Sequence, residues 1–145
     1  MLTKYREWLR EDVLIQQAAQ VSRLGTCNRL RVGAVIARGQ RVLSSGYNGA
    51  PAHMPHCDHG PDESGCRATV HAEANAIVWA ARQGVQTDGS ILYVTHTPCL
   101  ECAKLIINAG IWRVVFLDDY RLTEGKELLN AAGIVVHQHQ GPPVQ

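Results

Sequence analysis

Beyond residue 90, the chain alternates between short apolar segments and helical ones. Strand-like segments cover 91–95, 112–117 and 134–137, and helical segments cover 99–109 and 124–132. A strand followed by a helix and another strand is typical of parallel strands joined by right-handed crossovers. The second half of the chain therefore predicts an α/β fold in which the last three strands are parallel.

The first half adds a helix, a hairpin and a long irregular segment. Residues 5–24 predict a helix with Leu14, Ala18 and Val21 on one face, and 71–82 predicts a second helix that is rich in alanine. Strands are predicted at 32–37 and 41–47. The connection between them is so short that these two strands must be antiparallel. We therefore expect a mixed five-stranded sheet flanked by helices, with an irregular loop over 48–70.

The length and composition fit one soluble domain over 1–145 with a short mobile tail from about 139. Apolar residues make up 46% of the chain and charged residues 19%. The sequence has no apolar run of about 18 residues and no signal peptide at its start, so we expect a cytoplasmic protein without a membrane partner. The formal net charge of +1 gives no reason to expect a nucleic-acid partner.

Two short segments carry residues that suit a metal site, namely 71–73 (His-Ala-Glu) and 98–102 (Pro-Cys-Leu-Glu-Cys). Cys99 and Cys102 are three residues apart at a predicted helix start, where both thiolates lie on one face near the positive end of the helix dipole. His71 would be the third ligand. Three protein ligands leave the fourth position of a tetrahedral zinc for water, as in a catalytic site.

Glu73 follows His71 by two residues, so both can reach one site only if His71 lies at the very start of its helix. Glu73 would then bind the reacting water and carry its proton. A Cys-x-x-Cys pair alone could equally be a redox pair or half of a structural zinc site. The combination of the two segments, each opening a helix, is much more specific and matches the pattern of zinc deaminases.

The chain resembles the cytidine deaminase superfamily, and within it the deoxycytidylate (dCMP) deaminases, over about residues 10–136. The motifs that carry the resemblance are 31–36 (RVGAVI), 46–51 (GYNGAP), 71–77 (HAEANAI) and 98–104 (PCLECAK). The resemblance implies a three-layer sandwich and zinc-dependent hydrolysis of dCMP to dUMP and ammonia. It also implies that the Asn48 side chain binds the substrate sugar and that the Ala72 N–H binds the pyrimidine O2. Tyr120, which follows a predicted strand, is expected to line the pocket.

The resemblance further implies a homo-oligomer, for which we expect a hexamer, activated by dCTP and inhibited by dTTP. Arg29, Arg31, Arg38 and Arg41 are close in sequence and predict an anion site near Tyr47 and Asn48. A nucleoside triphosphate with its Mg²⁺ could bind there, and the residues expected to touch an effector or a phosphate are Arg29, Arg31, Tyr47 and Gly49. Solvated charges at a strand edge are the alternative.

A second group of metal-binding residue types lies in and near the irregular loop. Several members of the resembled family hold a structural zinc there, and we expect the ligands to be Cys27, Cys57, Cys66 and His59, with His56 and His53 less favoured. A closed four-ligand site would stabilise a loop that has little core of its own. The alternative is that these are buried thiols and solvated histidines.

Several assignments remain open in the sequence. The substrate phosphate needs a cation or backbone amides, and the candidates are Arg29, Arg31, Arg67, Arg121 and Lys126. His96 is expected to pack beside the metal-binding helix, and His137 and His139 are expected to be solvated tail residues. Two other functions are considered, namely an adenosine deaminase acting on transfer RNA and a non-catalytic zinc module that binds a nucleotide.

Overall fold

The computed structural model describes residues 2–60 and 65–144, and its elements follow the predicted order. The helices are α1 (Leu2–Ser22), α2 (Ala72–Arg82), α3 (Leu100–Asn108) and α4 (Glu124–Ala131). The strands are β1 (Gly33–Arg38), β2 (Arg41–Tyr47), β3 (Ile91–His96), β4 (Arg113–Asp118) and β5 (Val135–Gln138). Most bounds lie within one or two residues of those predicted, and α1 begins three residues earlier.

The five strands found in the described ranges form one sheet in the order β2-β1-β3-β4-β5. β1 pairs antiparallel with both β2 and β3, whereas β3, β4 and β5 are parallel. This confirms the predicted mixed α/β sheet. The carboxyl ends of β3 and β4 lie beside the start of β1 and the end of β2, so one edge of the sheet gathers residues from four strands.

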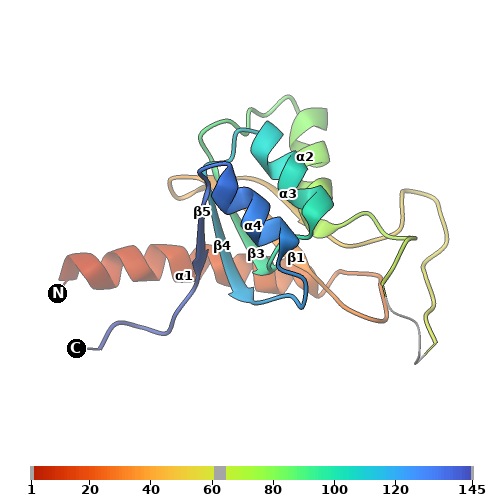
Figure 1. Cartoon of the computed structure of the whole chain (residues 1–145), viewed down its shortest axis with the longest axis horizontal. Coiled ribbons are helices and arrows are strands. Elements are labelled where there is room, and N and C mark those ends of the chain that lie inside the picture. The colour runs from red at the N-terminus through yellow and green to blue at the C-terminus, as the bar shows by residue number, and fades with distance from the viewer. Residues whose placement is uncertain (1, 61–64, 145) are drawn as a thin grey trace.

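Helices cover both faces of the sheet and make a three-layer arrangement (Figure 1). α1 lies across one face, where Leu14, Ile15 and Ala18 pack against Val35 and Tyr93. α2, α3 and α4 cover the other face and form the larger apolar cluster with alternate residues of the strands. Such alternation is what a sheet buried on both sides requires.

The chain after β5 is bound to α1, so the prediction that His139 is a solvated tail residue is wrong. The His139 side chain is only 6% exposed, and its two ring nitrogens lie 2.8 Å from Glu11 and 2.9 Å from Asp12. Its ring stacks on Trp8 at 5.9 Å between centroids, and the Trp8 indole N–H donates to the Gln140 carbonyl. Contacts to a helix more than 120 residues away in sequence are not visible in local composition.

None of the helices in the described residues is long and apolar enough to cross a membrane.

Candidate metal centre and substrate pocket

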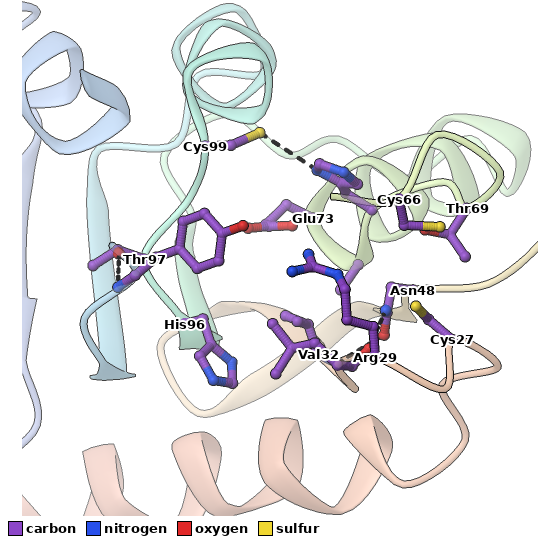
Figure 2. A pocket seen from close by; sticks show the side chains of 14 residues that line it. Cys27, Arg29, Val32, Asn48, Cys66, Thr69, Glu73, His96, Thr97 and Cys99 are labelled. Atoms are coloured by element: carbon purple, nitrogen blue, oxygen red, sulfur yellow. Dashed lines mark hydrogen bonds between the residues drawn. The ribbon is translucent and has the colours of Figure 1, made fainter. Parts of the chain in front are cut away.

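The amino-terminal ends of α2 and α3 meet at the edge of the sheet and bring three metal-binding side chains together. His71 is the N-cap residue of α2, and Cys99 is the N-cap residue of α3. The Nδ1 atom of His71 lies 3.4 Å from Sγ of Cys99 and 3.4 Å from Sγ of Cys102. Figure 2 shows the contact between His71 and Cys99, drawn as a dashed line. The predicted position of His71 at the helix start is confirmed.

These three side chains fit a zinc ion. A tetrahedral zinc with bonds of about 2.0 Å to nitrogen and about 2.3 Å to sulfur separates those ligand atoms by about 3.5 Å. The observed separations of 3.4 Å agree with that value, and the three ligand atoms lie within 4.8 Å of one another. His71, Cys99 and Cys102 therefore form a zinc site that leaves one tetrahedral position without a protein ligand.

The site ionises one of its thiols readily. Hydrogen bonds with the Cys102 thiol and with His71 lower the pKa of Cys99 to about 4, against the opposing effect of burial. The pKa of Cys102 is raised, because it shares its proton with Cys99 and is buried. The hydrogen bond with Cys99 raises the pKa of His71. A thiolate at a helix amino terminus is the ligand that a divalent zinc ion requires.

Glu73 is a buried carboxyl group beside this centre. Its side chain points into the pocket (Figure 2), and the residue is only 5% exposed. Burial raises its pKa above the ordinary value. A carboxyl group whose pKa is raised toward neutrality takes up and releases protons more easily at physiological pH than an exposed one. This is the behaviour that a proton carrier needs.

Two glycines allow close packing at the helix starts that carry the metal ligands. A Cβ atom on Gly46 of β2 would collide with the backbone of Ala72 and Ala76 in the first turns of α2. The glycine of the 46–51 motif therefore lets α2 lie directly on β2. A Cβ atom on Gly125 of α4 would collide with the backbone of Pro98 and of the metal ligand Cys99, so Gly125 lets α4 lie against the start of α3.

A cavity that is open to solvent lies beside the metal centre. Its walls include Glu73 and all three residues expected to touch substrate, namely Asn48, Ala72 and Tyr120. Ala72 is the first residue of α2, so its N–H precedes the helical hydrogen-bond ladder and is available to an acceptor.

The Asn48 side chain has a structural task that the sequence did not reveal. Its Oδ1 atom accepts a hydrogen bond from the Val32 N–H at 2.7 Å, and its Nδ2 atom donates one to the Leu30 carbonyl at 2.7 Å. Asn48 is 7% exposed and thus fixes the segment that precedes β1 against the end of β2. One Nδ2 hydrogen remains for a ligand in the cavity.

The four residues predicted to bind a second metal are brought together in space. The ligand atoms of Cys27, Cys57, His59 and Cys66 lie within 4.8 Å of one another. Asn28 ties the two segments together, because its side chain donates to Asp58 at 2.9 Å and accepts from the His59 N–H at 3.1 Å. The set has the composition and number of ligands of a closed structural zinc site.

The thiols of this second cluster differ in pKa. Burial opposes ionisation of Cys66, yet hydrogen bonds from the side chain and backbone of Thr69 lower its pKa to about 6. Burial and hydrogen bonds with Cys27 and Cys66 raise the pKa of Cys57 to about 11. Cys27 and Cys66 also line the cavity, so the two clusters flank a single pocket.

We expect protein purified without chelators to contain two zinc ions per chain, one in each cluster. The Cys57→Ser variant should retain one zinc, because three ligands hold a structural zinc much more weakly than four. The His56→Ala variant removes a neighbouring histidine that lies outside the cluster and should retain both ions. Elemental analysis of the three proteins checks this, and one zinc per chain in the parent protein would contradict it.

The predicted cluster of four arginines near Tyr47 does not exist. Gly33 pairs with Tyr47 at one end of the β1–β2 ladder, whereas Arg38 pairs with Arg41 at the other end. The Arg38 guanidinium donates to the carbonyl groups of Gln86 and Asp88, at 3.0 and 2.7 Å. The two ends of a hairpin are separated by its full length, even where the residues are close in sequence. Of the four arginines, only Arg29 lines the pocket.

Arg29 is the member of the five phosphate candidates that lines the cavity. Its Nε atom is buried and has no hydrogen-bond partner among the described residues. A hydrogen bond with the Tyr120 phenol raises the pKa of Arg29, so this side chain is a permanent cation. A buried donor without a partner is the feature expected of a group that awaits an anionic ligand.

Sequence reasoning missed several residues of the cavity wall, among them His96 and Thr97. The Thr97 hydroxyl oxygen accepts a hydrogen bond from the Tyr120 N–H at 2.7 Å and so holds the loop after β4 against the pocket. His96 was expected only to pack beside the metal-binding helix. His96 ends β3 and Thr97 follows it, just before the metal ligand Cys99. This position in the sequence could have identified both as residues of the site.

Comparison with known proteins identifies relatives over most of the chain. Residues 9–118 match the family described as "Cytidine and deoxycytidylate deaminase zinc-binding region". ComE operon protein 2 of Bacillus subtilis is 46% identical over 78% of this chain, which spans 62% of that protein's length. Deoxycytidylate deaminase of Mycobacterium phage D29 is 38% identical, with 73% of this chain and 92% of the relative aligned. The crystal structure of dCMP deaminase from the cyanophage S-TIM5 in complex with dCMP and dUMP has a TM-score of 0.82, with 34% identity over 88% of this chain and 94% of the other.

Proposed function

The chain belongs to the cytidine and deoxycytidylate deaminase zinc-binding family, and we propose that within it the chain hydrolyses dCMP to dUMP and ammonia. The observation that carries this proposal is a buried Glu73 beside a three-ligand zinc site that borders an open cavity. Support for dCMP comes from the dCMP deaminases among its relatives, one of which was crystallised with dCMP and dUMP.

The residues of the site divide the chemistry among them. His71, Cys99 and Cys102 would hold the zinc ion, which would supply a Lewis acid that lowers the pKa of the attacking water. Glu73 would take one proton from that water and pass it to N3 of the cytosine ring as the bond from the water oxygen to C4 forms. Glu73 would then take the proton of the new C4 hydroxyl group and deliver it to the departing amine, so that the C4–N bond breaks and C4 becomes a carbonyl. One carboxyl group would thus serve as base and as acid.

The other residues that line the cavity would bind the base, the sugar and the phosphate of the nucleotide. The Ala72 N–H would donate to the pyrimidine O2, and Asn48 would contact the sugar through its remaining Nδ2 hydrogen. Arg29 would hold the phosphate, since its buried Nε lacks a partner among the described residues. Tyr120 lies against Arg29 and would close the same end of the cavity. A non-catalytic zinc module would have no use for Glu73 in this position.

Regulation and assembly rest on the family resemblance. The chain would form a hexamer, activated by dCTP with Mg²⁺ and inhibited by dTTP. With Arg29 assigned to the substrate phosphate, the remaining candidates for effector binding are Arg31, Tyr47 and Gly49. Tyr47 is 38% exposed and its ring lies beside Gly49, so this part of the β2 end is accessible to a ligand.

A substrate panel tests the proposal. The zinc-loaded protein is assayed with dCMP, CMP, dCTP, cytidine and a transfer RNA, and the highest kcat/KM is expected with dCMP. Adding dCTP or dTTP to the dCMP assay tests regulation, and the mass in solution tests assembly. Turnover of adenosine in transfer RNA without turnover of dCMP would replace the proposed substrate.

A further inference from the structure

His96 lines the cavity but belongs to neither metal cluster. It is the last residue of β3. Ala34 pairs with Val94 in the antiparallel β1–β3 ladder, so the register continued by two residues places His96 opposite Val32. Figure 2 shows the two side chains next to each other, on the side of the pocket away from Cys99. His96 is therefore part of the pocket wall at a distance from the metal.

The hydrogen bonds around His96 allow its Nδ1 atom to act as an acceptor. The Thr95 hydroxyl oxygen accepts a hydrogen bond from the Gly33 N–H at 3.2 Å, and it lies 3.1 Å from Nδ1 of His96. When the Thr95 hydroxyl donates to Nδ1, the proton of the neutral ring lies on Nε2. In this tautomer His96 offers an N–H donor from Nε2, for which the described residues provide no acceptor.

Burial lowers the pKa of His96, and the nearby carboxylate of Asp118 offsets only part of that effect. The surroundings therefore favour the neutral ring. A neutral ring that is protonated on Nε2 presents one donor in one direction, which suits an oxygen acceptor of a ligand.

The acceptor follows from how the rest of the nucleotide is held. Under the proposed function, Glu73 serves N3 and the Ala72 N–H serves O2, which leaves the sugar and phosphate oxygens. Arg29, Leu30 and Val32 line the cavity together with His96. Under the proposed function, Arg29 supplies the cation for the phosphate. A phosphate has several terminal oxygens, so it accepts from more than one donor. We propose that the Nε2–H of His96 donates a hydrogen bond to the nucleotide phosphate beside Arg29. This inference rests on the proposed function.

The experiment compares ligands with and without the phosphate. The zinc-loaded parent, His96→Ala and His96→Gln are tested with dCMP as substrate and with dUMP and deoxyuridine as competitive inhibitors. In His96→Ala, the Ki of dUMP should rise about tenfold or more, equivalent to about 1.4 kcal/mol. The Ki of deoxyuridine should stay within about twofold, and kcat should change much less than KM, as expected for a group that binds but does not react.

Two variants separate binding from structural damage. His96→Gln should recover part of the dUMP affinity, because the glutamine amide places an N–H at a similar reach. The control His137→Ala removes a histidine of β5 whose side chain is 41% exposed, and it should behave like the parent. Zinc content and unfolding temperature are measured for all variants. Direct calorimetric binding of dUMP gives the same comparison without turnover.

The outcomes decide the assignment. An unchanged Ki for dUMP in His96→Ala, or an equal loss for dUMP and deoxyuridine, would overturn the phosphate contact while leaving dCMP deamination intact. A parent protein that binds dUMP no better than deoxyuridine and does not deaminate dCMP would overturn both proposals together.

Discussion

Replacing Glu73 with glutamine is expected to leave zinc binding and folding intact and to lower kcat by about 10³-fold or more. Glutamine has nearly the same shape, so it fills the buried space that Glu73 occupies. Its amide can hydrogen-bond the reacting water, yet it cannot accept a proton from that water or donate one to the leaving amine. Since Glu73 acts at both steps, the loss exceeds that of a single missing hydrogen bond.

The measurement is kcat for dCMP together with zinc content and the unfolding temperature. Glu101→Gln is the matched control, because Glu101 lies between the metal ligands Cys99 and Cys102 but its side chain is 77% exposed and pairs with Lys104. The control should keep the parent's turnover. A Glu73→Gln variant within tenfold of the parent, about 1.4 kcal/mol of barrier, would remove Glu73 from the mechanism.

Alanine at His71, Cys99 or Cys102 should release the catalytic zinc and abolish turnover. With only two of these ligands left, the site cannot retain the ion at ordinary concentrations, and no group in the described part of the chain replaces the missing one. The effect on Cys102→Ala should include a loss of stability, because Cys102 is 2% exposed and packs in the interior.

Metal analysis separates this result from damage to the second cluster. Each of these three variants should fall from two zinc ions per chain to one, whereas Cys57→Ser should lose the other ion and keep turnover of dCMP measurable. Variants of His71 and Cys99 with unchanged zinc and turnover would contradict the assignment of the centre.

Much of the fold could be predicted because its signals are local. The strand–helix alternation after residue 90 predicts parallel strands, and the short turn between β1 and β2 leaves only an antiparallel pair. The metal centre could likewise be predicted from the sequence. The spacing of Cys99 and Cys102 and the place of His71 before a helix are properties of short segments.

The remaining features depend on contacts between distant segments. His139 is buried because β5 places it against Glu11 and Asp12 of α1. The sequence near residue 139 does not indicate this contact. Arg38 is far from the pocket because it lies at the opposite end of the β1–β2 ladder from Tyr47. The place of His96 in the cavity wall follows from the register between β1 and β3, and a register is not visible in one strand alone.

The most direct test of the account is deamination of dCMP in water enriched in ¹⁸O, with the products measured by mass spectrometry and an ammonia assay. The account predicts dUMP that carries one ¹⁸O atom on the pyrimidine ring, with one ammonia released per dUMP, from the zinc-loaded parent and not from Glu73→Gln. Recovery of unchanged dCMP from a folded protein with its zinc in place would contradict it.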